Sequence, residues 1–305
     1  MIWTNSFELS RIVRIFMSNG SVLFVFIAGY LFQHLSVKYS PNKYYINKLK
    51  NVILPYLIIS IPAIIVFVYF QQRERVWESF YDNPEWLQII YFYLTGRHLA
   101  PLWFVPMISI FFLISPLLIA ADKNKKIYYL LPIFLLISCW IERGLPYISF
   151  IHFFSAYLLG MFCSHFKHKL NPILSQPKTL LLLGSMILAF ALGEFFFMKG
   201  TMTWVNYLQK ISACLFFLGL LIYYGDKLTS PIINVVANAS FGIFFIHSYV
   251  LTAGKLSYTQ LVGDLPSGNP VLHIVITLST LFLCVSIILG IQKLFGRSSR
   301  YLIGS

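Results

Sequence analysis

The chain has 305 residues, of which 58% are hydrophobic and only 11% are charged, and its mean hydropathy is +0.75. A soluble domain carries roughly a quarter charged residues, so this composition excludes an ordinary water-soluble protein. The net charge of +13 does not indicate a nucleic-acid partner, because the cationic residues cluster in short segments between apolar runs, where they would face anionic lipid headgroups.

About nine apolar stretches of roughly 16–25 residues follow one another, and some 20 helical residues cross the hydrocarbon core of a bilayer. They predict an all-α, polytopic transmembrane helix bundle that forms one integral-membrane domain over residues 1–305. The expected spans are 20–36, 51–70, 100–121, 127–141, 149–165, 179–198, 204–224, 231–253 and 272–295.

Two segments outside these spans have distinct predictions. Residues 1–19 hold Arg11 and Arg14 but no secretory signal, and they predict an amphipathic helix that lies at the membrane interface. Residues 71–99 form the longest hydrophilic loop, and their mixed charge and two tryptophans predict an ordered cap on the outer side.

The distribution of cationic residues predicts the orientation. Of the 23 lysines and arginines, fourteen fall in one alternate set of loops and eight in the other, with Lys210 inside a span. The positive-inside rule therefore places the lysine-rich loops and the C-terminus in the cytoplasm, and we expect a bacterial inner (plasma) membrane protein. Nine spans would then leave the N-terminus outside with Arg11 and Arg14, which suggests a further span upstream of Met1.

The four cysteines predict neither a disulfide nor a metal site. Each lies inside an apolar run without CxxC spacing, as expected of buried free thiols. We therefore expect no bound metal.

Ionisable groups inside the bilayer are costly and so are candidates for function. Glu194 and Lys210 lie near the outer ends of consecutive spans, at similar depth, and form either a structural ion pair or part of a substrate pocket. Arg97 and His98 lie at an outer helix end and are further candidates for substrate binding.

Two kinds of histidine are expected. His247, alone on an apolar helix, is either a packed, hydrogen-bonded histidine or a catalytic base, because imidazole can take a proton from a hydroxyl near neutral pH. His34, His165 and His168 lie beside lysines at the inner edge and are expected to be solvated loop residues.

The basic stretch before the second span offers a candidate donor site. Lys48 and Lys50 could bind the phosphates of a cytoplasmic donor, or they could simply reflect the positive-inside orientation.

Several segments, in order along nearly the whole chain, give the sequence a family resemblance. It resembles the membrane-bound acyltransferase 3 family, whose FFxxSGYLL, basic-stretch-Pro-Tyr, LWFLP and SYGIYLIH segments it matches in turn, with a weaker fifth match. The matching segments are Phe24–Phe32, Lys48–Tyr56, Leu102–Pro106, Ser240–His247 and, more weakly, Tyr157–Met161.

The resemblance implies a ten-helix bundle that moves an acyl group, often acetyl, from cytoplasmic acyl-CoA to a hydroxyl of an envelope glycan or glycolipid. It also implies a catalytic histidine on a first helix, after an arginine at fixed spacing. Neither Arg11 nor Arg14 is followed by a histidine before His34, so the chain is expected to lack that helix and to be truncated or inactive as written. The family's RxxR pair stands here as Lys48 and Asn51, and asparagine cannot replace the arginine fork.

The resulting prediction is a membrane O-acyltransferase, with an O-acetyltransferase as the simplest case. Its donor would be acetyl-CoA or another acyl-CoA, and its partners would be membrane lipid and a glycan or glycolipid acceptor. The alternatives are a glycan or lipid transporter without enzymatic activity, a glycan polymerase, or a structural subunit of a polysaccharide-export complex.

Overall fold

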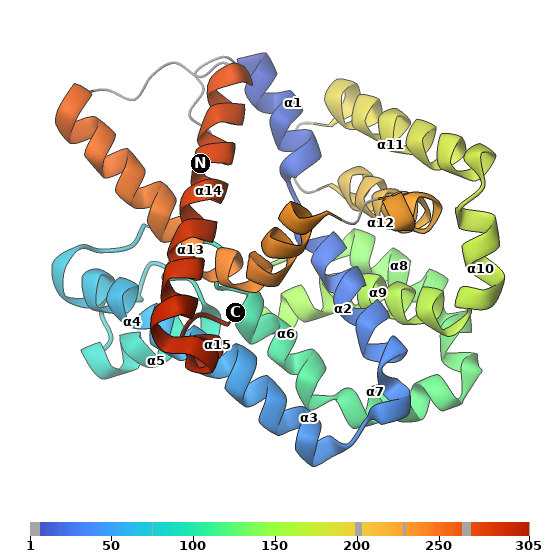
Figure 1. Cartoon of the computed structure of the whole chain (residues 1–305), viewed down its shortest axis with the longest axis horizontal. Helices are drawn as coiled ribbons and strands as arrows, with labels where there is room; N and C mark the ends of the chain where they lie inside the picture. The colour runs from blue at the N-terminus through green and yellow to red at the C-terminus, as the bar shows by residue number, and fades with distance from the viewer. Residues whose placement is uncertain (1–6, 75, 199–202, 228–229, 264–269, 305) are drawn as a thin grey trace. The chain divides into compact units, whose positions relative to one another are not determined.

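The computed structural model describes residues 7–74, 76–198, 203–227, 230–263 and 270–304, and every regular element in these ranges is helical (Figure 1). The all-α prediction is therefore confirmed. Within these ranges seven helical segments are long and apolar enough to cross a membrane, or up to eight if the bent pair Phe104–Leu113 and Ser115–Lys123 counts as one span. The seven are Arg11–His34, Pro41–Phe70, Pro146–His165, Pro177–Phe197, Trp204–Tyr224, Pro231–Val262 and Val271–Phe295.

Two of the nine expected spans take a different form: 100–121 is a pair of helices bent by 54° at a break, and 127–141 is too short. Over 127–141 the regular helix α8 covers only Leu131–Trp140 and follows a 3₁₀ segment, η4 (Lys125–Leu130). Ten helical residues rise about 15 Å, roughly half of the hydrocarbon thickness. Pro132 lies in the first turn of α8, where its missing N–H costs nothing, so it favours the start of a helix at this point.

The chain divides into two compact units, and each is built from segments that are distant in sequence. The first unit combines residues 42–109 with 230–305, and the second combines 7–41 with 110–229. The helices of the first unit are α3 (Pro41–Lys48), α4 (Leu54–Ile65), α5 (Glu85–Thr95), the first part of α6 (Phe104–Leu113), α13 (Pro231–Val262), α14 (Pro270–Phe295) and α15 (Ser299–Ile303). The helices of the second unit are α1 (Phe7–Met17), α2 (Ser21–His34), α7 (Ser115–Lys123), α8, α9 (Pro146–His165), α10 (Lys167–Leu174), α11 (Pro177–Phe197) and α12 (Trp204–Tyr224).

The core of the second unit is the contact between α2 and α9. A Cβ added at Gly29 would lie 2.1 Å from the carbonyl oxygen of Tyr157, and one added at Gly160 would lie 2.1 Å from that of Phe26. The two backbones therefore touch, as small residues allow in membrane helices. Phe111 stacks on Tyr157 at a centroid distance of 4.3 Å and extends this core.

The first unit is built around α4 and α13. Tyr56 of α4 and Phe245 of α13 are buried in one apolar cluster with Leu102 and Val105. Tyr249 of α13 donates a hydrogen bond to the carbonyl oxygen of Ile59 at 2.6 Å. Two π-helical turns, Leu49–Ile53 and Val66–Phe70, flank α4, and such turns are frequent at functional positions.

The hydrophilic loop 71–99 is folded in its described residues. α5 occupies its second half, and Phe80 and Phe92 are fully buried against the ring of Trp77 and other aromatic side chains. An ordered cap was predicted here from the tryptophans, and its placement on the outer side stays a prediction.

The N-terminal segment forms a helix where one was expected. α1 begins at Phe7, residues 1–6 of the predicted interfacial helix lie outside the described residues, and its location at the membrane interface stays a prediction. A short turn separates α1 from α2, and Asn19 in this turn has a left-handed backbone with φ of 57°.

Candidate functional site

A buried polar layer lies between α11 and α12 in the second unit, where these helices are otherwise apolar. Glu194 of α11 and Asn206, Gln209 and Lys210 of α12 are each at most 4% exposed. Burial of charged and amide groups inside apolar helices is costly unless they are hydrogen-bonded, so the partners of each group indicate its role.

Lys210 has a complete set of partners. Its ammonium nitrogen donates to the carbonyl oxygens of Ile15 at 2.9 Å and Phe16 at 3.0 Å, and to Gln209 Oε1. Ile15 and Phe16 belong to the last turn of α1, whose carbonyls lack partners within the helix and attract positive charge. Lys210 therefore caps α1 and has no ammonium hydrogen left over for a ligand.

Arg11 makes the reciprocal contact. It donates from α1 to the carbonyl oxygens of Phe195 and, at 3.1 Å, of Met198 at the end of α11. Its guanidinium also lies over the Phe195 ring, 4.8 Å from the centroid. Helix α1 is thus fixed to both α11 and α12 by cationic caps.

Glu194 and Lys210 occupy the same layer, as their positions predicted, but no direct ion pair joins them in the described chain. Instead Asn206 Nδ2 donates to Glu194 Oε2 at 2.8 Å and to the carbonyl oxygen of Ile15 at 3.0 Å. Three buried atoms of this layer have no hydrogen-bond partner among the described residues: Glu194 Oε1, Asn206 Oδ1 and Gln209 Nε2. They leave two acceptors and one donor, a set that can bind hydroxyl groups.

His152 lies in the same unit and has both ring nitrogens occupied. Its Nδ1 donates to the carbonyl oxygen of Ile141 at 2.6 Å, and its Nε2 accepts from Asn19 Nδ2 at 3.2 Å. A ring held in this way has no free nitrogen for proton transfer, so His152 is a structural residue.

In the first unit, His98 is fully buried among aromatic rings. Its Nδ1 donates to the carbonyl oxygen of Phe92 at 3.1 Å, and its Nε2 has no partner among the described residues. The rings of Tyr56 and Tyr93 lie 6.0 and 6.4 Å from it. Burial lowers the pKa of His98 to about 4, so the ring is neutral at neutral pH.

The other candidates of the first unit lie on separate segments of the chain. Arg97 is half-buried with its guanidinium 6.0 Å from the Trp77 centroid. His247 is half-buried on α13, and its Nδ1 donates to the carbonyl oxygen of Ile243 at 2.9 Å. Lys48 is half-buried with its ammonium 5.3 Å from the Tyr44 centroid, whereas Lys50 is exposed in the first π-helical turn.

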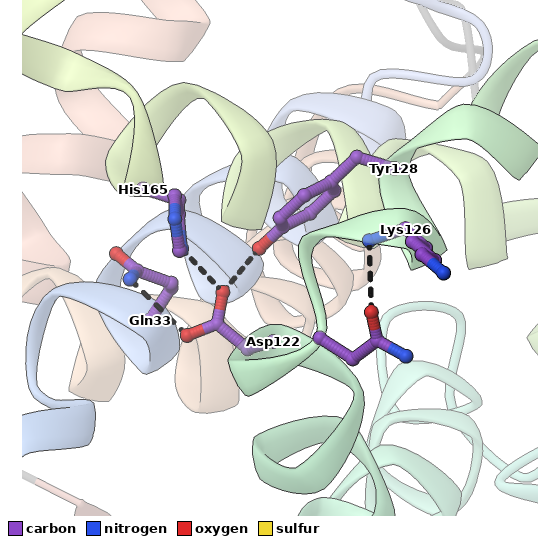
Figure 2. Close-up of polar contacts among 6 residues, drawn as sticks. Gln33, Asp122, Lys126, Tyr128 and His165 are labelled. Carbon is purple, nitrogen blue, oxygen red and sulfur yellow. Dashed lines mark hydrogen bonds and ion pairs between the residues drawn. The ribbon is translucent and has the colours of Figure 1, made fainter.

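Sequence reasoning missed one well-formed polar cluster, which Figure 2 shows. Asp122 at the end of α7 accepts hydrogen bonds from Tyr128, His165 and Gln33. His165 was expected to be a solvated loop residue, but it contacts this buried carboxylate at 2.8 Å. The sequence signal that could have indicated this cluster is Asp122 itself, an acidic residue at the end of an apolar span and next to the lysines that follow it.

The segments that carry the family resemblance meet in space within each unit. In the first unit, residues of Lys48–Tyr56, Leu102–Pro106 and Ser240–His247 pack in the cluster around Tyr56. In the second unit, Phe24–Phe32 and Tyr157–Met161 meet where Gly29 and Gly160 bring α2 and α9 together. Segments that resemble the family and are distant in sequence therefore pack against one another, as expected of one inherited fold.

A comparison with family models decides the identification. The model of the acyltransferase 3 family, described as an acyltransferase domain, matches residues 2–289. The chain belongs to the acyltransferase 3 family. Searches of curated proteins and of solved structures gave no match. Together with its long apolar helices, the match makes the chain an integral membrane protein of an acyltransferase family.

Proposed function

We propose that this acyltransferase 3 protein is a membrane O-acyltransferase, which moves an acyl group, most simply acetyl, from acyl-CoA to a hydroxyl of an envelope glycan or glycolipid. The family match over residues 2–289 is the observation that carries the proposal. The protein would reside in a bacterial inner membrane with its lysine-rich loops and C-terminus in the cytoplasm, where acyl-CoA is available.

The proposed reaction needs a proton acceptor and a cationic donor site. The acceptor oxygen attacks the thioester carbonyl, the carbon–sulfur bond breaks, and the hydroxyl proton passes to a base. His247 is the base that the sequence predicts, and its Nδ1–H bond to Ile243 leaves the lone pair of the neutral ring on Nε2. Lys48 and Lys50 are the proposed contacts to the CoA phosphates.

The acceptor side is proposed from groups with unused hydrogen-bonding capacity. Glu194 Oε1 in the second unit and the neutral His98 Nε2 in the first unit are proposed as separate contacts, each of which can accept from a sugar hydroxyl. Arg97 is exposed enough to contact a polar acceptor. Lys210 contributes indirectly, because its ammonium group is fully used on α1.

The test is acyl transfer in membranes from cells that produce the chain. Radiolabelled acetyl-CoA is added, and the label in the glycan and lipid fractions is measured before and after mild alkali, which cleaves esters but not amides. Alkali-labile label that depends on the chain supports O-acyl transfer. Absence of label with acetyl-CoA and with longer acyl-CoAs, in membranes shown to contain the folded protein, would exclude it.

A further inference from the structure

Two amide side chains of α12 are held at one end and have no partner at the other end among the described residues. Gln209 Oε1 accepts a hydrogen bond from the ammonium group of Lys210, so Gln209 Nε2 is the end without a partner. Asn206 Nδ2 donates to Glu194 Oε2 and to the carbonyl oxygen of Ile15, so Asn206 Oδ1 is the other such end. Both orientations are fixed, because an ammonium group only donates and a carbonyl oxygen only accepts.

The same reasoning fixes the orientation of Asn19 in the turn after α1. His152 Nδ1 donates to the carbonyl oxygen of Ile141, so the lone pair of the neutral ring lies on Nε2. Asn19 Nδ2 donates to this nitrogen at 3.2 Å, and Asn19 Oδ1 has no partner in the described chain. The His152 ring lies 4.8 Å from the ring of Tyr207, which follows Asn206 on α12, so the turn adjoins the polar layer.

With Glu194 Oε1, these groups provide three acceptors and one donor that are buried and still able to form hydrogen bonds. The four residues, Asn19, Glu194, Asn206 and Gln209, are each at most 3% exposed. Buried polar atoms are rarely left without a partner, so several in one region indicate that water or a ligand binds there.

The balance of donors and acceptors selects the chemistry of a ligand. A carboxylate or phosphate only accepts hydrogen bonds, so it would be repelled by Glu194 and Asn206 Oδ1. A cationic ligand would enter a layer that already contains the ammonium group of Lys210. A hydroxyl group is neutral, and it both donates and accepts. Neighbouring hydroxyls of a sugar ring therefore match this set of atoms.

The end of α1 covers these atoms in the structure. The carbonyl oxygens of Ile15 and Phe16 accept from the ammonium group of Lys210, and Arg11 donates to the carbonyl oxygens of Phe195 and, at 3.1 Å, of Met198. Because the atoms without partners are buried in this arrangement, the end of α1 has to shift before a ligand can enter.

We propose that this layer recognises an uncharged sugar unit of the acceptor through two or more of its hydroxyl groups, with Asn206 and Gln209 as specificity-determining residues beside Glu194. This inference rests on the proposed function. Glu194 Oε1 and Asn206 Oδ1 accept from sugar hydroxyls, and Gln209 Nε2 donates to a hydroxyl or to the ring oxygen. Lys210 is a positioning residue, because its bond to Gln209 Oε1 leaves Nε2 for the ligand.

The first test uses the wild-type protein alone. Material labelled in the radiolabelled acetyl-CoA transfer assay is cut into sugar units by enzymes that leave esters intact, and mass spectrometry identifies the unit that carries the acetyl group. We expect an uncharged unit, such as a hexose or a deoxyhexose. An acetyl ester on a uronic acid, on a phosphorylated or free amino sugar, or on a lipid alcohol would overturn the proposal. Absence of any label would remove the proposed function itself.

The second test inverts single atoms of the layer. Gln209→Glu keeps an oxygen for Lys210 but replaces the Nε2 donor with an acceptor, and Glu194→Gln keeps an oxygen for Asn206 but can present a donor in place of Oε1. The purified variants, in lipid nanodiscs, are assayed with acetyl-CoA and varied amounts of a glycan and glycolipid extract from the host cells. Each should raise KM for the extract at least about tenfold, the effect of roughly one hydrogen bond, and change KM for acetyl-CoA less than threefold.

Gln176→Glu is the matched control, because it makes the same exchange at an exposed glutamine that directly precedes α11. Values of KM for the extract within about twofold of this control, for both variants, would overturn the proposal and leave the buried atoms to ordered water. A fall in kcat without a change in this KM would also contradict recognition by the layer. If neither variant folds, the identity of the acetylated sugar unit, which needs no variant, decides.

Discussion

At the scale of single residues, charge in the sequence predicted which positions form the buried polar layer, but it did not predict their hydrogen-bond partners. Glu194 and Lys210 stand out in apolar spans, and the structure buries both in one layer. Their partners, Asn206 and Gln209, carry no charge and gave no signal. The carbonyls of α1 that bind Lys210 are backbone groups, and a side-chain pattern cannot predict them. Of the two alternatives that the sequence left open, the direct ion pair does not form, and amide and carbonyl contacts take its place.

The capping role of Lys210 predicts a loss of stability when its charge is removed. Lys210→Met keeps most of the side-chain volume but removes the donor to the carbonyl of Phe16 and leaves the carbonyl of Ile15 with Asn206 alone. A buried acceptor left unsatisfied costs about 1–3 kcal/mol, so the melting temperature in detergent should fall. Lys178→Met, at an exposed lysine of α11, serves as the control and should change it little. Equal melting temperatures for the two variants would refute the capping role.

His98 predicts a pH-dependent stability. Because burial lowers its pKa from 6.5 to about 4, the unfolded chain binds a proton at a pH where the folded chain does not. His98 therefore costs nothing above pH 6.5, and it lowers the free energy of unfolding progressively as the pH falls toward 4, by about 3 kcal/mol in the limit.

The check for His98 is the melting temperature of the wild type and of His98→Gln across this pH range. The wild type should lose stability relative to the variant as the pH falls, because glutamine does not titrate. Parallel curves for the two proteins would show that His98 is not buried in its neutral form.

At the scale of helices, the apolar runs predicted most of the spans because length and hydropathy are local properties of the sequence. Two expected spans are exceptions. The span 100–121 is broken into two helices, and 127–141 is apolar enough but folds as a 3₁₀ segment followed by the ten residues of α8. The extension of the second expected span, 51–70, back to Pro41 was also missed. The added residues include a basic stretch, whose low hydropathy predicts the end of a span, and a π-helical turn, which hydropathy does not predict.

The backbone contact between α2 and α9 predicts that Gly29 tolerates no side chain. Gly29→Ala would place a methyl group 2.1 Å from the carbonyl oxygen of Tyr157, so the helices must separate. Such overpacking costs about 1–3 kcal/mol. Gly184→Ala on α11 is the matched control, because its nearest neighbour lies at an ordinary 3.6 Å. Thermal unfolding in detergent measures both, and a melting temperature of Gly29→Ala no lower than that of the control would contradict the close contact.

At the scale of the whole molecule, the family match confirmed what the ordered motifs had suggested, but the two interleaved units could not be read from the sequence. Each unit joins segments that are distant in sequence, and hydropathy does not encode which helices pair. The cluster around Tyr56 shows the consequence, because three short matches become one packed group only in the folded chain. The same limit hid the approach of His165 to Asp122, which are 43 residues apart.

The central claim is that this membrane-embedded protein takes acyl groups from CoA on the side of its lysine-rich loops. Sealed membrane vesicles of both orientations, given radiolabelled acetyl-CoA on the outside, test it most directly. We expect alkali-labile label in the glycan or lipid fraction of inside-out vesicles and none in right-side-out vesicles. Label in right-side-out vesicles alone, or in neither preparation, would contradict the account.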